Sequence, residues 1–359
     1  MSVSRYYFKI LMIVLLGFTA SCKPVYYEND IKEIDFLDTP RYALIPEQLD
    51  SCPIGIDDII SFGDYLFATV KDPSSQLRIY DVNNDCLIAS IGSRGRANNE
   101  FISPQFVGDQ VYIRDDELYL PVIDNMTILK EINVTESIKQ SEAVVPFRTF
   151  CIGPAEGRIS LLDNDITKTF VFVKPLLLNE KATQPLYLIK EEGLDAVRIP
   201  AFKDVIEGDN RVNVLAQYLG GLKKHPQRNV IVQPMQNMDY ILFFDVDSMR
   251  YYAVHQLGSR TFEDKVIENI NYSPSSYCFG DGAVSKDFFL VNYCARVIAN
   301  PDDEVKTEIL MFDWEGNFIK GFTANVAMHR ITYNESNQTL YGCDLSNEKL
   351  YKVSLKDYL

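Results

Sequence analysis

Two arginines lie in the segment Gly92–Arg96, which reads Gly-Ser-Arg-Gly-Arg directly after a predicted strand. The guanidinium groups of Arg94 and Arg96 could hold an anionic ligand in a chain that is otherwise acidic. The segment opens no helix, so it lacks the geometry of a phosphate-binding loop. The alternative is a connection between strands whose charges are solvated. Arg94 and Arg96 are therefore candidates for ligand binding.

Three further candidates follow in the second half of the chain. Asp281 lies between Gly280 and Gly282, and an acid between two flexible glycines can face a ligand. His329 and Arg330 begin a predicted strand, where an imidazole and a guanidinium could bind a ligand together. The competing interpretations are a plain turn at Asp281 and a structural histidine within the strand. Asp281, His329 and Arg330 complete the predicted set of ligand-binding residues.

No motif for catalysis or metal binding accompanies these residues. The chain has three histidines, His225, His255 and His329, and none belongs to a His-Glu-x-x-His motif. Cys-x-x-Cys, Gly-x-Ser-x-Gly, and Ser-x-x-Lys with its partner motifs are missing as well. We therefore predict no catalytic residue, no metal site and no cofactor. A calcium ion held by scattered acids has no sequence signature, and it stays an open alternative.

The segment Asp81–Asp85 begins like a calcium-binding loop, with oxygen-bearing side chains at alternate positions. The pattern then ends, because Cys86 stands where the loop needs glycine and Gly92 where it needs a bidentate glutamate. Asp and Asn side chains also cap tight turns between strands. We therefore predict a hairpin turn at this position.

The same phrase occurs three times along the chain. An apolar strand, an aromatic-Asp pair, a polar turn and a second strand recur at residues 77–92, 242–254 and 310–322. Runs of β-branched and aromatic residues bounded by Asn and Asp are typical of β-hairpins. A supersecondary unit that recurs predicts a repeat architecture.

Groups of four strands cover most of the chain. Short strands at even spacing indicate an all-β fold, and repeated groups of four select the β-propeller, whose blade is a four-stranded sheet. We predict one domain, residues 31–359, that forms six four-stranded antiparallel blades, with five or seven blades as alternatives. The predicted groups span residues 57–91, 109–146, 145–190, 213–256, 276–322 and 327–355. Helical periodicity is almost absent; residues 209–222 could form a short helix or a loop followed by a strand.

The last group has three strands, and residues 31–37 (IKEIDFL) form a spare strand near the N-terminus. Pairing this strand with the last blade would close the ring and leave no free edge there. Innermost strands line the channel of a propeller, so His329 and Arg330 are expected at the channel. His255 falls on a predicted outer strand and is expected to be exposed.

The first residues predict export and lipid anchoring. Arg5 and Lys9 precede an apolar run that is too short to span a bilayer, and small residues then lead to Cys22. This layout matches the lipobox of bacterial lipoproteins; a plain secretory signal is the alternative. The predicted segments are a lipoprotein signal peptide at residues 1–21, lipidation at Cys22 and a tether at 22–30. The expected location is the cell envelope, at the outer membrane, facing the periplasm or the surface.

The charge balance limits the partners. The net charge is −15, and removal of residues 1–21 leaves 33 basic against 50 acidic residues. Such a surface repels phosphate backbones, which excludes nucleic acid. The expected partners are the membrane, through the N-terminal lipid, and a protein or glycan. Six cysteines follow Cys22 at irregular spacings, which predicts mostly buried thiols with at most one or two disulfides.

One stretch resembles a known family. Residues Ile91–Phe101 (IGSRGRANNEF) are similar to the "IG..G.GPgEF" phrase of TolB-like and NHL-like six-bladed propeller lipoproteins from gut bacteria. Residues 63–70 (GDYLFATV) and 77–85 (LRIYDVNND) fit as well, and the resemblance covers residues 30–359. Arg96–Asn99 replaces the usual Gly-Pro-Gly, so a different loop conformation is expected. The resemblance implies a fold and an exported lipoprotein; it implies no activity.

These observations predict an envelope-anchored lipoprotein that acts as a non-catalytic propeller binding module for a protein or glycan. The alternative is a propeller enzyme of the lactonase, lyase or glycan-processing kind, with a site in the central channel. A structural spacer without a ligand is a third possibility. Carboxylates that converge on a shared metal would favour the enzyme, and unconnected apolar and hydroxyl groups would favour binding.

Overall fold

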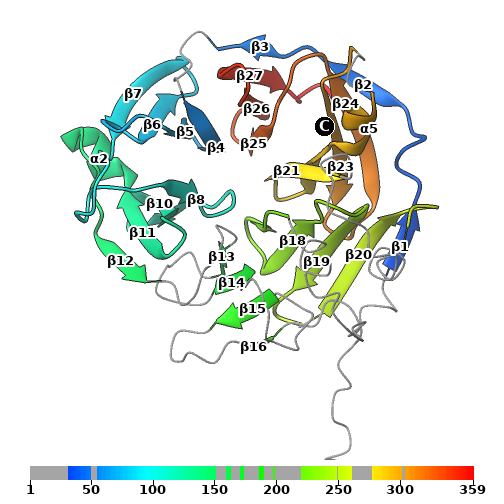
Figure 1. Cartoon of the computed structure of the whole chain (residues 1–359), viewed down its shortest axis with the longest axis horizontal. Helices are drawn as coiled ribbons and strands as arrows, with labels where there is room; N and C mark the ends of the chain where they lie inside the picture. The colour runs from blue at the N-terminus through cyan, green and yellow to red at the C-terminus, as the bar shows by residue number, and fades with distance from the viewer. Residues whose placement is uncertain are drawn as a thin grey trace, which may run out of the picture.

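A computed structural model describes residues 31–49, 55–150, 159–162, 170–173, 186–189, 197–198, 220–248, 250–260, 277–300 and 304–359. Within these residues the chain forms sheets of mostly antiparallel strands arranged in a ring, as Figure 1 shows. The all-β propeller predicted from the sequence is therefore confirmed. No helix in the described part of the chain combines the length and the apolar character needed to cross a membrane.

The first blade shows how the sequence builds each hairpin. Its strands pair in chain order: β4 (Ile56–Phe62), β5 (Tyr65–Val70), β6 (Leu77–Asp81) and β7 (Cys86–Ile91). At the end of β6, Asp81 Oδ1 accepts hydrogen bonds from the amides of Asn83 at 2.8 Å and Asn84 at 3.2 Å. The Oδ1 atoms of Asp245 and Asp313 likewise accept a hydrogen bond from the backbone amide two residues ahead. The predicted hairpin turns are confirmed.

The second blade contains a helix that the sequence analysis did not predict. Its strands are β8 (Pro104–Phe106), β9 (Tyr112–Arg114), β10 (Glu117–Asp124), β11 (Ile128–Asn133) and β12 (Phe147–Phe150). Helix α2 (Val134–Gln140) lies between β11 and β12, and the Asn133 side chain caps it by accepting the Glu136 amide at 2.9 Å. Two turns of helix are too few for an apolar period to stand out.

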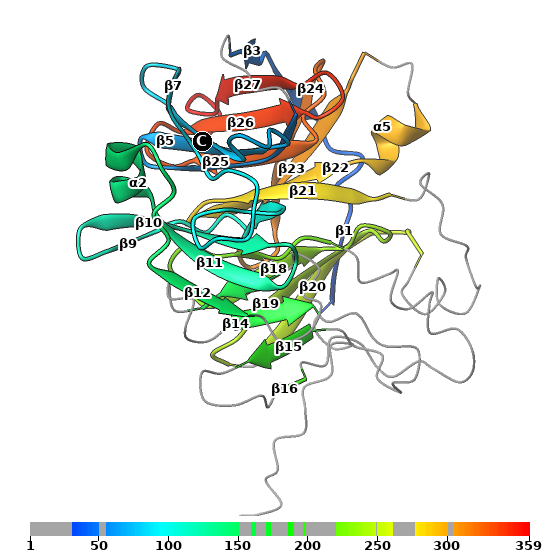
Figure 2. The same cartoon turned by 60° about the vertical axis from the view of Figure 1, so that its left-hand side comes forward.

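Three more blades lie in the second half of the chain. One blade contains β17 (Lys223–Lys224), β18 (Val230–Pro234), β19 (Tyr240–Asp245) and β20 (Arg250–Gln256). The next blade contains β21 (Phe279–Val284), β22 (Phe288–Tyr293), β23 (Thr307–Asp313) and β24 (Phe318–Ala324). The last blade contains β25 (Arg330–Asn334), β26 (Thr339–Asp344) and β27 (Lys349–Ser354). Figure 2 shows a second short helix, α5 (Ala295–Ala299), projecting beyond the end of β22.

A further sheet lies between β12 and β17 in the chain. Its strands β13 (Ile159–Leu161), β14 (Phe170–Val173), β15 (Leu186–Ile189) and β16 (Val197–Arg198) pair antiparallel in that order. The structure shows five blades, so the predicted number of six is not confirmed. The segments that connect the strands of this further sheet lie outside the described residues. Most of residues 209–222 also lie outside them.

The N-terminal segment corrects the predicted ring closure. Strand β1 (Ile31–Ile34) pairs in parallel with β20, β2 (Arg41–Leu44) pairs in parallel with β24, and β3 (Glu47–Gln48) pairs antiparallel with β27. The strand that completes the last blade is therefore β3, and not residues 31–37. Periodicity identifies a strand but not its partner, and three sheets offered a free edge. We call residues 31–48 the N-terminal strap.

The strap changes the environment of His255. Glu33 of β1 lies opposite His255 of β20, so β20 is no longer an outer strand. The imidazole is 2% exposed and stacks on the Tyr240 ring with centroids 4.1 Å apart. Burial lowers its pKa. The expectation of an exposed histidine was wrong, because it assigned no fifth strand to this blade.

Apolar cores lie between neighbouring blades. Phe36 of the strap is fully buried between the β20 and β24 blades, with its ring 5.7 Å from that of Phe312 and 5.9 Å from that of Tyr293. Arg41 Nε pairs with the buried Glu308 Oε1 at 2.6 Å. Of the cysteines, Cys278 and Cys343 are buried as expected, Cys294 is half-buried, and Cys86 is exposed; all four are free thiols.

Candidate binding site in the central channel

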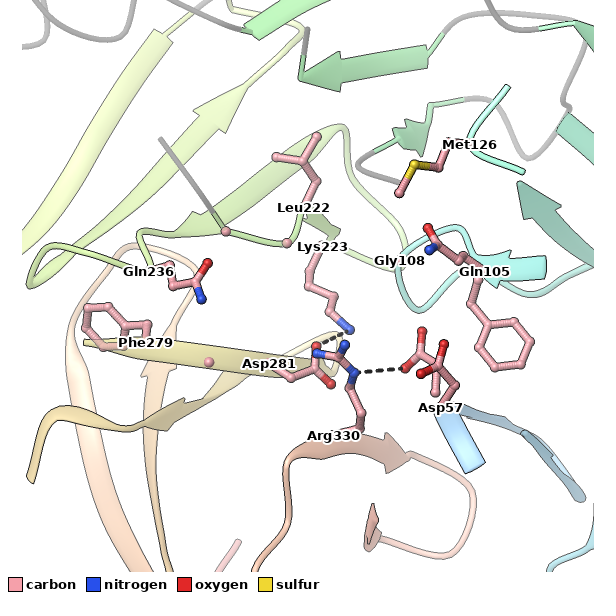
Figure 3. Close-up of a pocket in the computed structure, with 15 residues that line it drawn as sticks. Asp57, Gln105, Gly108, Met126, Leu222, Lys223, Gln236, Phe279, Asp281 and Arg330 are labelled. Atoms are coloured by element: carbon pink, nitrogen blue, oxygen red, sulfur yellow. Dashed lines mark ion pairs between the residues drawn. The ribbon is translucent and has the colours of Figure 1, made fainter. Parts of the chain in front are cut away.

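A cavity of about 380 Å³ opens at the end of the channel where the innermost strands begin. Its charged lining comes from separate blades: Asp57 and Asp58 from β4, Lys223 from β17, Asp281 from β21 and Arg330 from β25. Figure 3 shows Lys223, Asp281 and Arg330 pointing toward one another across this space. We call this cavity the carboxylate mouth.

Bulges in two innermost strands lie beside the carboxylate mouth. The register of β4 shifts between Ile56 and Asp58, and that of β21 shifts between Phe279 and Gly282. A bulge bends a strand and redirects a side chain, and bulges are frequent next to functional sites. Asp57 and Asp281 are the acids that these two shifts carry into the mouth.

Gly282 is required by close packing, and the predicted turn at this position was wrong. Gly280, Asp281 and Gly282 all belong to strand β21. A Cβ atom on Gly282 would lie 2.7 Å from the Phe289 ring and 2.8 Å from the Leu290 carbonyl oxygen. The motif therefore forms a bulge in a strand that packs tightly on its neighbour.

The floor of the carboxylate mouth is a set of buried ion pairs. Lys223 Nζ lies 2.7 Å from Asp109 Oδ1 and 3.2 Å from Asp281 Oδ1. Asp281 Oδ2 also accepts the Ile331 amide at 3.0 Å. These side chains are about one tenth exposed or less. The floor joins three blades by these ion pairs, and the second oxygen of Asp109, Oδ2, is buried without a hydrogen-bond partner among the described residues.

Burial sets the proton affinities of the floor. Burial raises the pKa of Asp109 to about 6; Lys223 opposes this effect, and the charge of Asp281 adds to it. Burial alone would lower the pKa of Lys223, but Asp109, Asp281 and Asp58 outweigh it and raise that pKa. Lys223 therefore stays charged at neutral pH.

The wall of the mouth is less satisfied than its floor. Arg330 Nε lies 3.8 Å from Asp58 Oδ1, which is beyond hydrogen-bond distance. Among the described residues none accepts a hydrogen bond from the Arg330 guanidinium, and its Nε is buried. Burial and then the charge of Asp281 raise the pKa of Asp58 to about 7, against the opposing effect of Arg330. The wall therefore carries polar groups that a ligand could satisfy.

The opposite end of the channel has a different lining. A cavity of about 530 Å³ is lined by later parts of the same strands, including Ser61 of β4 and Tyr333 of β25, together with His225. His225 Nδ1 accepts the amides of Gln227 at 2.9 Å and Arg228 at 3.0 Å. Burial and the nearby Arg228 lower the pKa of His225 to about 4. We call this cavity the histidine mouth.

The structure brings two of the predicted ligand-binding residues together, Asp281 and Arg330. Arg94 and Arg96 lie elsewhere, on an exposed loop after β7 whose Arg94 forms a bridge with Phe101. His329 is exposed outside the channel, where its Nδ1 accepts the Leu345 amide at 3.1 Å. His329 precedes β25, which begins at Arg330, so it is not part of the innermost strand. Cys22 lies outside the described residues.

Sequence reasoning missed four residues of the site: Asp57, Asp58, Asp109 and Lys223. A signal was present, since Asp57 and Asp58 are the first polar residues of an innermost strand, as Arg330 is in the last blade. Lys223 belongs to the run Lys223-Lys224-His225, which is too short to stand out as a basic cluster. Comparing the starts of the innermost strands would have found Asp57, Asp58 and Lys223, whereas Asp109 lies between β8 and β9 and has no such signal.

The carboxylates of the mouth meet cations from the protein itself. Within the described ranges, no group of three or more His, Cys, Asp and Glu side chains is placed to hold a metal ion. Lys223 occupies the position between Asp109 and Asp281 where a cation is needed. The site can therefore bind polar groups through hydrogen bonds and charge, with Gln105 and Gln236 as further amide contacts.

Two solved structures resemble this chain at low sequence identity. A member of the DUF4221 family from Bacteroides vulgatus has a TM-score of 0.55 at 12% identity, with 88% of this chain and 96% of that chain covered. A candidate exported protein from Bacteroides fragilis has a TM-score of 0.52 at 10% identity, with 90% and 98% covered. At these identities the likeness supports the fold alone.

No family model matches the sequence. No curated protein matches it either.

Proposed function

We propose that this protein is an exported lipoprotein, acylated at Cys22 and held at the outer membrane, that works as a non-catalytic binding module. Its ligand is a polar group of a protein or glycan partner, and the carboxylate mouth binds that group. Loops and strand ends from several blades meet there, which suits recognition. The lipobox of the sequence supports the proposed location at the membrane. The acidic surface argues against nucleic acid as a partner.

One observation carries the binding proposal. In a cavity of about 380 Å³, the Arg330 guanidinium has no hydrogen-bond acceptor among the described residues. Cavities of this size are typical of small-molecule sites, and a guanidinium whose hydrogen-bond donors the described residues leave unused can donate to a ligand. Bulges at Asp57 and Asp281 place acids beside it.

A binding screen with a matched pair of variants tests the proposal. The full chain, purified in detergent, is titrated with soluble glycans and peptides and compared with Arg330→Gln and Arg94→Gln. We expect a ligand whose affinity falls at least about tenfold in Arg330→Gln and stays unchanged in Arg94→Gln. Ligands that bind both variants equally, or no ligand at all, would contradict the proposal. Loss of palmitate incorporation in Cys22→Ala tests the anchor separately.

A second candidate function is a propeller enzyme with a site in the channel, and Asp58 favours it. Burial and the neighbouring Asp281 raise the pKa of Asp58 to about 7, which suits a general acid or base near neutral pH. The test is product formation: the screened ligands are incubated with the wild-type chain and with Asp58→Asn, and analysed by mass spectrometry. Turnover that Asp58→Asn abolishes would replace the binding module by the enzyme.

We also propose that the β13–β16 sheet is the sixth blade, and that the chain is a TolB-like or NHL-like propeller. The antiparallel order of its four strands and its position between β12 and β17 support this assignment. An experimental structure of residues 151–219 within the full chain tests it. A sheet that does not face the channel would contradict six blades.

A further inference from the structure

Two opposite charges lie next to each other on the wall of the carboxylate mouth, and a ligand can use both. Arg330 Nε and Asp58 Oδ1 are 3.8 Å apart, which is close enough for attraction and too far for a hydrogen bond. Asp58 Oδ1 accepts one hydrogen bond, from the Ile59 amide at 2.9 Å. The pair is therefore held in place without being saturated.

The floor beneath this pair is not available in the same way. Asp281 has both oxygens engaged, with Lys223 and with the Ile331 amide, and Lys223 bridges Asp281 and Asp109. Disturbing these groups would leave buried charges unpaired, which costs more than a ligand contact returns. A ligand is therefore directed to the wall, where Arg330 and Asp58 are partly exposed.

The free guanidinium determines one end of the ligand. Arg330 presents a planar fork of N–H donors, and this fork matches a carboxylate through two parallel hydrogen bonds. A phosphate or sulfate would place more negative charge beside Asp57, Asp58 and Asp281, which line the same cavity. A single carboxylate is the anion that this surrounding tolerates best.

The surplus of acids determines the other end. Asp58, Asp109 and Asp281 face two cations, Lys223 and Arg330, while Asp57 of the same lining pairs with the exposed Lys71. The acids of the cluster therefore outnumber the cations that they share. The raised pKa of Asp58, caused by burial and then by Asp281, agrees with this surplus. An ammonium group beside Asp58 would pair with this acid and offset the negative charge that the ligand's carboxylate brings to the cluster. A ligand with two ammonium groups is disfavoured, because Arg330 would repel the second.

We propose that the carboxylate mouth binds an α-amino carboxylate, with its carboxylate on Arg330 and its ammonium group on Asp58. In such a zwitterion the carboxylate and the ammonium group are bonded to the same α-carbon. Their short separation matches the adjacent positions of Arg330 and Asp58. The cavity of about 380 Å³ leaves room for a side chain, with Gln105 and Gln236 at its border. This inference rests on the proposed function and names the class of ligand.

Calorimetric titration of the full chain in detergent tests the inference. The probes are the twenty free L-amino acids, and for the tightest one its N-acetyl derivative, its methyl ester and its α-hydroxy acid. We expect the free amino acid to bind, and each of the N-acetyl and ester forms to bind at least about tenfold more weakly. Equal binding of either derivative would overturn the inference, as would the absence of binding by any amino acid.

Substitutions of Arg330 and Asp58 test which of these residues binds the carboxylate of the ligand and which binds its ammonium group. Arg330→Gln and Asp58→Asn should each weaken the free amino acid at least about tenfold, and Arg330→Lys should weaken it less, because it keeps the charge without the fork. In Asp58→Asn the preference for the amino acid over its α-hydroxy acid should disappear. Arg94→Gln and Asp116→Asn, at exposed positions, are the controls. Thermal melting verifies that each variant is folded.

The outcomes separate this inference from the proposed function. A glycan or peptide that needs Arg330, in a protein that binds no amino acid, would overturn the α-amino carboxylate and leave the binding module standing. If no probe of any class responds to Arg330→Gln, both proposals fail. A preference for the amino acid over its α-hydroxy acid that survives in Asp58→Asn would contradict the role given to Asp58.

Discussion

The two mouths of the channel are built from the same strands and use their polar groups differently. In the histidine mouth, His225 accepts two amides of its own loop and lies against Trp314, with ring centroids 4.7 Å apart. In the carboxylate mouth, Arg330 makes no hydrogen bond with a described residue, and Asp58 carries a raised pKa.

This difference indicates which polar groups serve the fold and which can serve a ligand. Side chains that satisfy backbone amides stabilise the fold whether or not a ligand is present. Charged groups left partly unsatisfied cost stability, and they are maintained where function needs them. The bulges of β4 and β21 lie at the carboxylate mouth, which is consistent with this assignment.

The largest expected effect is on the floor of the carboxylate mouth. Lys223→Met removes the cation that Asp109 and Asp281 share, so two buried carboxylates lose their partner. Breaking a buried pair typically costs about 3–5 kcal/mol, and we expect a loss of this size in urea unfolding at pH 8. Lys71→Met is the control, since its pair with Asp57 is exposed. A loss below about 1 kcal/mol for Lys223→Met would contradict the buried ion pairs of the floor.

Gly282→Ala tests the bulge that carries Asp281. The new methyl group would meet the Phe289 ring and the Leu290 carbonyl, and backbone yields little. Overpacking of this kind costs about 1–3 kcal/mol, measured by urea unfolding. Gly221→Ala is the matched control, because its Cβ would meet no atom within 4 Å. Equal stability of the two variants would contradict close packing around Gly282.

His225→Phe tests the histidine mouth. It keeps an aromatic ring against Trp314 and removes the acceptor of two amides, so we expect a loss of about 1–2 kcal/mol at pH 7. The pKa of His225 is lowered to about 4. As pH falls from 6.5 toward 4, the unfolded state takes up the proton first and the folded state loses stability. This loss should be absent in His225→Phe, and ligand affinity at the other mouth should not change.

Asp58→Asn should change stability in the opposite direction. The pKa of Asp58 is raised to about 7, so between pH 4 and 7 the folded state holds a proton that the unfolded state has released. Its contribution therefore falls as pH rises through this range and is lowest above pH 7. We expect Asp58→Asn to be more stable than the wild type by about 1 kcal/mol at pH 8 and to differ little at pH 4. A destabilised variant at pH 8 would contradict a surplus of acids.

Local patterns predicted the hairpins well. The turns after Asp81, Asp245 and Asp313 form where the sequence placed them, because an Asx side chain needs only the amides that follow it. Helix α2 was missed since two turns carry too little periodicity. The Gly280–Gly282 segment was misread as a turn, because packing against Phe289 rather than chain flexibility explains its second glycine.

The sequence by itself determined the strands, the turns and the repeat, because apolar alternation and turn residues act over a few positions. Only the tertiary structure decided which edges the N-terminal strap would cover, and that Asp58, Asp109, Lys223, Asp281 and Arg330 would meet. The physical reason is distance along the chain. Pairing of a free edge and attraction between buried charges depend on neighbours that closure of the ring brings together, and no local pattern encodes those neighbours.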